Sequence, residues 1–330
     1  MLQKGGELVV TPGRSQVQDW NRRIVALANN KGGVKKTSTT VNVAGQLAAS
    51  GFKVLVVALD TQRESAATDL GYADRSDHGA SLAAAMINAT ATAKIITDVR
   101  PKLDVIADGP VLESVVAHLY GAVGRGEQDY EAAFALLRPV LATVVAPYDL
   151  VLIDCPPGNK VLVDAALGAA RYLLIPTATD QGSIRSMAGT AEAFVGARAQ
   201  NPSLQLIGVL LTGSGTQASM TRVAAREAIN NDFGGQAPLF DSFVRHAEAP
   251  ASKARDRGLL AHELERDEAQ AAASNPWWKL RGKPGSDPQP RRAAWTTNSS
   301  GLAGDYQRVT SELVDRITAV EQRTTVGEPA

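Results

Sequence analysis

Two glycines, a lysine and a hydroxyl-bearing residue precede a helical pattern near the start of this chain. The stretch NNKGGVKKTSTTVNVA, residues 29–44, contains Gly32, Gly33, Lys36 and Thr37. Main-chain N–H groups at a helix N-terminus attract anions, and the helix dipole strengthens the attraction. Glycines let the backbone approach phosphate oxygens, the lysine can reach the outer phosphates, and the hydroxyl can coordinate Mg²⁺. The stretch is a candidate nucleotide site; the alternative is a tight strand-to-helix turn with incidental lysines.

A carboxylate suited to magnesium lies much later in the chain. The apolar run LVLIDCPPG carries Asp154 at its end. Carboxylates are the hard oxygen ligands that Mg²⁺ prefers. A strand-end aspartate can also simply cap a turn, but the two features in this order favour a site for a nucleotide and its metal.

Lys35 stands where loops of this kind place a glycine. If that position requires a positive φ, a residue with a Cβ atom costs about 1–2 kcal/mol. The long side chain can crowd the phosphates, whereas its charge can attract them.

Composition excludes several classes of protein. The chain has 330 residues, with 34 basic and 34 acidic side chains, so nucleic-acid binding would need a local patch. Cys155 is the one cysteine, which excludes a disulfide framework and a Cys-pair metal site within the chain. Neither a secretory signal nor an 18-residue apolar run is found, so we expect a cytoplasmic protein without a membrane helix. The histidines show no metal-ligand spacing; they are His78, His118, His246 and His262.

Short apolar runs alternate with helical patterns, which predicts a doubly wound, mostly parallel α/β sheet with helices on both faces. The predicted strands are 24–29, 53–60, 103–108, 148–154, 171–176 and 204–212. The predicted helices are 37–51, 80–91, 129–145, 161–170, 183–198 and 217–230.

We expect a single domain with several appended segments. They are a polar leader 1–22, the main domain 23–264, a Pro/Trp/Arg-rich insertion loop 265–300, a final helix 301–320 of the same domain, and a tail 321–330. Tryptophans and basic residues in 276–298 could contact DNA, but packing of the tryptophans on the domain is the favoured interpretation. An apolar stripe predicts that the final helix packs on the sheet; membrane binding is the minor alternative.

Several motifs in order resemble the ParA/MinD family of P-loop ATPases. KGGVKKTST (31–39) resembles its deviant Walker A motif, usually KGGxGKTT. ALDTQRESA (58–66) resembles the DxDPQGNA signature, and YDLVLIDCPPG (148–158) is close to its Walker B strand. FVRHAEAP (243–250) resembles a late VRLxEAP segment, which favours the partition (ParA/Soj-like) branch.

The resemblance implies a role for each matching residue. Lys31 would reach the partner subunit's nucleotide, Lys36 would bind phosphate, and Asp60 would orient the attacking water. Thr37 and Asp154 would hold Mg²⁺. The implied ATP contacts are Lys31, Gly32, Gly33, Val34, Lys35, Lys36, Thr37 and Ser38. Arg245 matches a position linked to non-specific DNA binding, with a solvated surface charge as the alternative.

Other positions depart from the family pattern. Ala58 replaces the first aspartate of DxD, Thr61 replaces the proline, and Arg63 replaces the glycine. Because positioning and charge stabilisation dominate phosphoryl transfer, ATP binding can survive while turnover is weak.

The resemblance thus implies a partition ATPase of a plasmid, phage or chromosome that binds ATP and Mg²⁺. It would form an ATP-dependent homodimer on non-specific DNA, associate with the nucleoid, and be stimulated by a ParB-like partner. Two alternatives stay open: a nucleotide-binding scaffold that does not hydrolyse ATP, and a MinD-like ATPase that cycles on membranes.

Overall fold

The computed structural model describes residues 20–326, apart from residues 63, 89, 216–217, 233–234, 236 and 275–298. Most of the expected leader, Arg63, and the tryptophans of the insertion (Trp277, Trp278 and Trp295) therefore lie outside the described residues.

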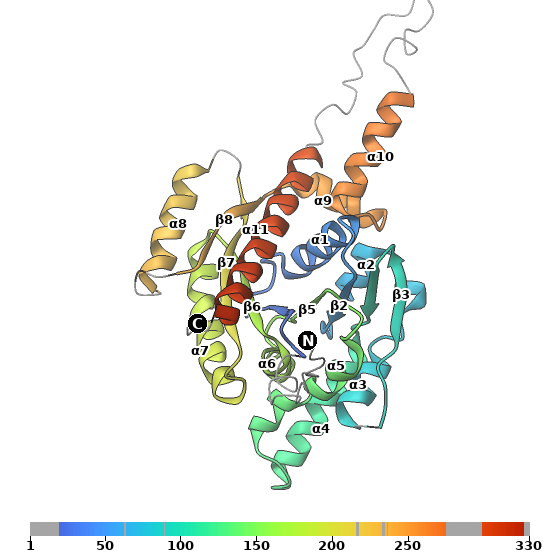
Figure 1. The fold of residues 1–330 in the computed structure, drawn as a ribbon, viewed down its shortest axis with the longest axis vertical. Helices are drawn as coiled ribbons and strands as arrows, with labels where there is room; N and C mark the ends of the chain where they lie inside the picture. Colours follow the sequence, from blue (N-terminus) through green and yellow to red (C-terminus); the bar gives the residue numbers. More distant parts are fainter. Residues whose placement is uncertain are drawn as a thin grey trace, which may run out of the picture.

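An eight-stranded sheet forms the centre of the molecule, in the order β3-β4-β2-β5-β1-β6-β7-β8 (Figure 1). The strands are β1 Ile24–Leu27, β2 Val54–Ala58, β3 Ile95–Arg100, β4 Leu103–Ile106, β5 Leu150–Asp154, β6 Tyr172–Ala178, β7 Gln205–Ser214 and β8 Leu239–Arg245. Strand β3 runs antiparallel to β4, and the other neighbouring pairs are parallel. The prediction of a doubly wound, mostly parallel sheet is confirmed.

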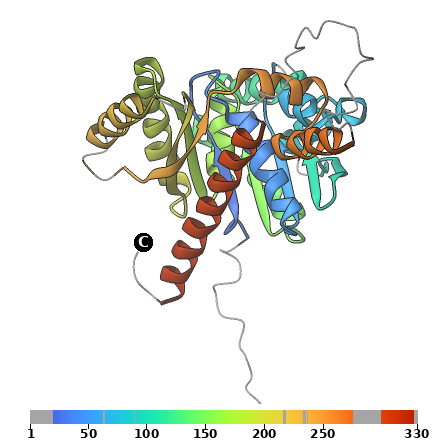
Figure 2. The same ribbon diagram turned by 90° about the horizontal axis from the view of Figure 1, so that it is seen from above.

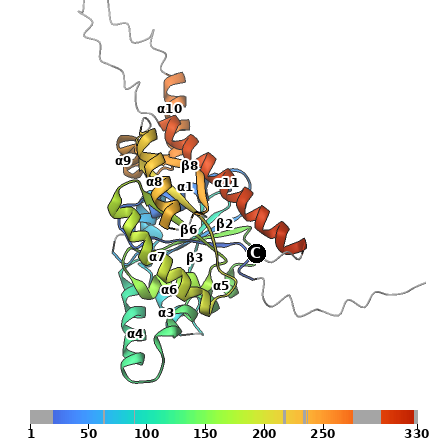
Figure 3. The ribbon, with the colours of Figure 1, turned by 90° about the vertical axis from the view of Figure 1, so that its left-hand side faces the viewer.

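Helices cover both faces of the sheet, as the continuous apolar strands require. On one face lie α1 (Lys36–Ala49), α2 (Ser65–Leu70) and α11 (Ser299–Val326), which share a core with alternate strand residues such as Val54 and Val56. The opposite face carries α3 Ala80–Ile87, α4 Glu113–Gly124, α5 Arg138–Val144, α6 Lys160–Ala169, α7 Gln181–Gln200 and α8 Ser219–Asp232. Figure 3 shows α3, α4, α6 and α7 on the side away from α11.

Helix α11 lies across β7 and β8 and beside α1 (Figure 2). Its predicted apolar stripe is confirmed: Tyr306, Val309, Leu313 and Ile317 are buried against the sheet. Helix α9 (Glu248–Asp256) precedes α10 (Ala261–Ser274), and α10 packs against both α9 and α11.

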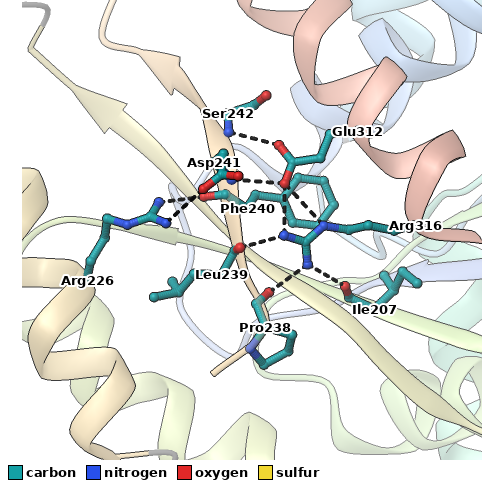
Figure 4. Close-up of polar contacts among 9 residues, drawn as sticks. All are labelled: Ile207, Arg226, Pro238, Leu239, Phe240, Asp241, Ser242, Glu312 and Arg316. Atoms are coloured by element: carbon teal, nitrogen blue, oxygen red, sulfur yellow. Dashed lines mark hydrogen bonds and ion pairs between the residues drawn. The ribbon is translucent and has the colours of Figure 1, made fainter. Parts of the chain in front are cut away.

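Polar groups attach α11 to β8 (Figure 4). Glu312 accepts hydrogen bonds from the main-chain N–H groups of Asp241 and Ser242, at 2.9 and 2.8 Å. Arg316 donates to the carbonyl oxygens of Pro238 and Leu239 at 3.1 and 2.5 Å, and its guanidinium stacks on Phe240. These contacts fix the C-terminal helix to strands that end near the loop of the candidate site.

Some predicted boundaries differ from the structure. The pattern at 129–145 forms a 3₁₀ turn, Tyr130–Ala135, and then α5, which begins at Arg138. Pro139 lies in the first turn of α5, where proline is favoured. Residues 265–274, expected in the insertion loop, belong to α10, which continues to Ser274; residues 275–298 of that segment lie outside the described residues. Strands β3 and β8 were not predicted; both are edge strands with polar residues, so they lack a continuous apolar run.

Candidate functional site

The loop between β1 and α1 lies at the centre of the sheet, because β1 pairs with β5 on one side and β6 on the other. Gly33 has a φ of 78° and Lys35 a φ of 61°, so two left-handed residues curl the chain into the helix. Buried groups anchor the curl: Asn29 donates to the Pro176 carbonyl at 2.9 Å, and Thr212 donates to the Val34 carbonyl at 3.1 Å. The loop is thus held by β6 and by the next strand on that side, β7.

The side chain of Lys36, the first residue of α1, folds back onto this loop. Its ammonium is 3.0 Å from the carbonyl oxygen of Lys31, and the residue is only 6% exposed. Burial lowers the pKa of Lys36, while Asp154 opposes that shift. A buried ammonium in a loop that leads into a helix N-terminus is suited to an anion.

Thr37 and Asp154 meet as the sequence predicts. The Thr37 hydroxyl donates to Asp154 Oδ2 at 2.6 Å, and Thr40 lies 3.4 Å from the other oxygen. Burial raises the pKa of Asp154 to about 7, although the Thr37 hydrogen bond and Lys36 oppose the shift. A fully buried carboxylate served mainly by hydroxyls gains most from a cation, so this pair fits Mg²⁺.

Asp60 lies beside a surface pocket of about 410 Å³. One of its oxygens accepts a hydrogen bond from the Gln62 main-chain N–H at 2.9 Å. The pocket also contacts the loop after β5, with Pro156, Pro157 and Gly158, and helix α4. The carboxylate therefore borders a space that water can enter.

Lys31 points away from Lys36 and its own loop. Its ammonium is 2.7 Å from Asp180 Oδ1 and 2.9 Å from Ser183 Oγ, at the start of α7. The hydrogen bond from Lys31, and then one that the Ser183 hydroxyl donates to Asp180 at 2.6 Å, lower the pKa of Asp180. The Lys31 side chain keeps 37% of its surface exposed.

Lys35 extends toward the end of β7. Its Cε atom is 3.7 Å from the position that a Cβ atom on Gly213 would occupy. Burial, and then the nearby Arg255, lower the pKa of Lys35, and Glu248 raises it. Lys35 adopts the left-handed conformation, so the positive φ that would strain a residue with a Cβ atom is present at this position.

Ser38 connects the loop to α9. Its hydroxyl is 3.4 Å from Asp69 Oδ2, and Arg255 holds the other oxygen of Asp69 at 2.6 Å. The helix after the EAP segment is thereby tied to the first turn of α1.

Arg245 lies apart from this site, at the end of β8. Its guanidinium is paired through two nitrogens with Asp305 of α11, at 2.6 and 2.9 Å, and Asp305 is fully buried. Arg308 also contacts Asp305. Arg245 thus has a structural contact, and its contact with DNA stays a prediction.

Two further positions that the sequence singled out, Cys155 and Ala58, are buried. Cys155 packs in the core below the loop, and burial raises the pKa of its thiol. Ala58 is fully buried beside Asp154, its partner in the β2–β5 register. Among the described residues no group of three or more His, Cys, Asp or Glu side chains could hold a metal by itself. This suits Mg²⁺, which proteins often bind through one or two carboxylates together with substrate phosphates.

Sequence reasoning missed several residues around the loop. Asp180, Ser183, Asp69 and Arg255 come from three helices that are distant in sequence from residues 30–38. One signal was available: Asp180 follows β6, the neighbour of β1, and caps α7 by accepting a hydrogen bond from the Ser183 N–H. Such N-caps mark helix starts but do not reveal a tertiary partner.

Comparison with known proteins agrees with this geometry. Residues 22–205 match the family model described as an AAA domain. The chromosome partitioning protein ParA of Caulobacter vibrioides is 30% identical over 236 residues, which cover 69% of this chain and 84% of that protein. The chromosome-partitioning ATPase Soj of Thermus thermophilus is 34% identical over 191 residues, covering 58% and 69%.

A solved structure shows the same fold. Cobyrinic acid a,c-diamide synthase of Mycobacterium smegmatis, with a bound ATP analogue and magnesium, superimposes with a TM-score of 0.57. It is 24% identical, and the match covers 71% of this chain and 91% of that one. The sequence matches, the sheet order and the loop together show that this chain belongs to the ParA/MinD-type family of P-loop ATPases.

Proposed function

We propose that the chain binds ATP with Mg²⁺ at the β1–α1 loop and hydrolyses it slowly to ADP and phosphate. The pairing of Thr37 with Asp154 at 2.6 Å, next to the buried Lys36, carries this proposal. Lys36 would neutralise the outer phosphates, and Thr37 and Asp154 would hold the metal. When bound, Mg²⁺ would offset the phosphate charge that develops during transfer.

Asp60 would orient the attacking water from its place beside the pocket. The water oxygen forms a bond to the γ-phosphorus while the bond to the β–γ bridging oxygen breaks. Thr61, which replaces the proline of the family pattern, is buried next to Asp60 and alters the loop that would hold this carboxylate. Slow turnover follows from that change and from the alanine at position 58.

Two copies would assemble around two nucleotides. Lys31 supports this step because its ammonium lies outside its own loop and partly at the surface. On release from Asp180, it could reach the nucleotide of a second copy. ATP would then link assembly to nucleotide state, since a ligand that binds the dimer shifts the population toward it.

The dimer would bind DNA without sequence preference and act in partition of a plasmid, phage or chromosome. The similarity to partition proteins supports this role. A DNA-bound ParB-like partner would stimulate hydrolysis and release the dimer, and the protein would collect on the nucleoid. Arg245 is the proposed DNA contact, although its charge is already paired with Asp305.

A scaffold that binds ATP without hydrolysing it is the second candidate. The specific observation in its favour is Ala58, which leaves Asp154 without the neighbouring carboxylate of the family pattern. Calorimetric titration with ATP and Mg²⁺, followed by phosphate release with and without DNA, separates the two. Tight binding with no turnover in any condition would support the scaffold, and absence of binding would refute both.

A MinD-like membrane cycle is a third candidate with less support. The described residues include no helix long and apolar enough to cross a membrane. The apolar face of α11, which an amphipathic anchor would need, is buried against the sheet. Co-sedimentation with anionic vesicles in the presence of ATP would revive this candidate.

A further inference from the structure

Asp108 is a buried carboxylate without a partner. It is fully buried, and neither of its oxygens has a hydrogen-bond partner among the described residues. The hydroxyl of Tyr72, 1% exposed, is also unpartnered, and Asp108 helps to raise the pKa of that hydroxyl. Buried polar groups are nearly always satisfied, so two orphaned groups that interact electrostatically call for an explanation.

Asp108 lies on the same edge of the sheet as the nucleotide site. It follows β4 by two residues, Asp60 follows β2 by two residues, and Asp154 ends β5. These strands are direct neighbours in the order β4-β2-β5. Neighbouring strands are about 4.8 Å apart, so three carboxylates occupy adjacent strand ends. Burial and then the charges of Asp154 and Asp60 raise the pKa of Asp108 to about 8, although its own main-chain N–H opposes the shift.

Asp108 lies near the position on β2 where Ala58 replaces the aspartate of the family pattern. In the register of the sheet, Ala58 is opposite Asp154 of β5, and the preceding Val57 is opposite Ile106 of β4. The strand that lacks its carboxylate at residue 58 therefore runs between the two strands that end near Asp154 and Asp108. The position at which one carboxyl group has been replaced by a methyl group therefore has a second carboxyl group, that of Asp108, on the adjacent strand end.

We propose that Asp108 is a positioning residue of the nucleotide site, which acts on Asp154 and the Mg²⁺ end of the site through ordered water and replaces the carboxylate missing at Ala58. The proposal rests on the proposed binding of ATP and Mg²⁺. Water held by the Asp108 carboxylate and the Tyr72 hydroxyl would satisfy both orphaned groups. Partners in the outer shell of a metal orient its ligands, and their loss costs 10- to 100-fold in metal affinity.

Whether removal of the Asp108 carboxylate raises or lowers the stability of the protein distinguishes this role from a structural one. A buried carboxylate without a partner is unfavourable, so its removal should stabilise the protein in the absence of metal. Removal of a carboxylate that stabilises the fold would instead lower the stability of the protein. Asp104, also buried on β4, is such a case, because it accepts hydrogen bonds from the Asp98 N–H at 2.8 Å and the Tyr148 hydroxyl at 2.7 Å.

The test uses the full chain and measures ATP binding by calorimetry over a series of Mg²⁺ concentrations, with thermal unfolding in EDTA as a second readout. Asp108→Asn should raise the Mg²⁺ concentration for half-maximal binding about tenfold and raise the melting temperature in EDTA. Asp108→Ala should shift the Mg²⁺ curve in the same direction and serves if the amide is not tolerated. The control Asp104→Asn should lower the melting temperature and leave the Mg²⁺ curve in place.

A complementing variant sharpens the result. Ala58→Asp, added to Asp108→Asn, should move the Mg²⁺ curve back toward wild type. Curves for wild type and Asp108→Asn that superimpose, while wild type binds MgATP, would overturn this inference alone. Wild-type protein that binds no MgATP would instead overturn the proposed function, and this inference with it.

Discussion

The Lys31 ammonium is bound within its own chain by Asp180, at 2.7 Å, and not by the loop to which Lys31 belongs. Ser183 completes the contact at 2.9 Å and also donates from its main chain to Asp180. If Lys31 serves a second copy's nucleotide, this contact must break first. The free energy needed to break the Lys31–Asp180 ion pair would then be part of the cost of dimerisation.

Replacing Asp180 by asparagine should make ATP-dependent dimerisation easier. Exposed ion pairs contribute about 0.2–1 kcal/mol each, and both copies must break one, so the protein concentration at half-dimerisation should fall by about 2- to 30-fold. Light scattering against protein concentration, with ATP and Mg²⁺, measures this. Asp241→Asn breaks a comparable exposed pair with Arg226 and should not change the threshold. A midpoint that is the same for Asp180→Asn and wild type would show that Lys31 is not restrained by this contact.

Lys31→Ala should have the opposite effect on assembly. It removes the cation proposed to cross the interface while leaving Lys36, Thr37 and Asp154 in place. ATP should still bind to the monomer, and the dimer should be lost in the same scattering experiment. Dimerisation at the wild-type concentration would exclude a role of Lys31 across the interface.

Lys35→Gly should tighten ATP binding or raise turnover. Glycine relieves the left-handed strain of about 1–2 kcal/mol and removes a long side chain beside the loop. Greater freedom of the unfolded chain offsets about 0.4–1 kcal/mol, so stability should change little. Calorimetry and phosphate release measure the two effects; unchanged affinity and rate would mean that the loop accepts lysine without cost. Lys35→Met, which keeps the length without the charge, separates strain from electrostatics.

The stability of the metal-free protein should fall as pH rises from about 5 to 8. Asp108 has a pKa of about 8 in the fold and about 3.9 when unfolded, so the folded state binds the extra proton across this window. Stability therefore decreases with pH, by the linkage between proton uptake and folding. Urea unfolding in EDTA at pH 5 and pH 8 measures it. The charged groups that face Asp108 are Asp154, Asp60 and Glu64, and Asp108→Asn should flatten the slope. An equal slope in both proteins would place the titration elsewhere.

Arg245→Ala should destabilise the protein by about 2–4 kcal/mol, because it leaves the buried Asp305 with only Arg308 and the main-chain N–H of residue 245. Chemical denaturation measures the change. Arg125→Ala removes a partner from an ion pair at the surface, with Glu127, and should leave stability unchanged. DNA binding by Arg245 variants is therefore informative only at a temperature where they stay folded. Full stability of Arg245→Ala would show that the pair does not hold α11 to β8.

Local patterns predicted the centre of this molecule well. The six apolar runs that gave the inner strands are continuous because both faces of the sheet are covered, and helix α1 follows its loop as the glycines and Lys36 indicate. Thr37 and Asp154, both predicted to hold Mg²⁺, do contact each other, because a helix start and a strand end meet at one edge of the sheet; their role as metal ligands stays a prediction.

What the sequence did not reveal depends on packing between distant segments. The edge strands β3 and β8 are part polar, so their pattern is not distinct from that of loops. Asp180 and Asp108 look like ordinary turn aspartates in the chain. Their importance comes from Lys31 and Asp154, which the fold brings near them. Arg245 was predicted as a DNA contact, with a solvated surface charge as the alternative, and the sequence did not indicate its pairing with Asp305 of α11.

The contact between Glu312 and β8 has a consequence for how copies of this chain can associate. A strand at the rim of a sheet offers unpaired main-chain groups that a second chain can extend. Here the carboxylate of Glu312 accepts hydrogen bonds from two of these N–H groups, and Arg316 donates to the Leu239 carbonyl oxygen of the same strand. These groups of β8 are already paired within the chain, so strand addition at this rim would not compete with the proposed ATP-dependent assembly of two copies.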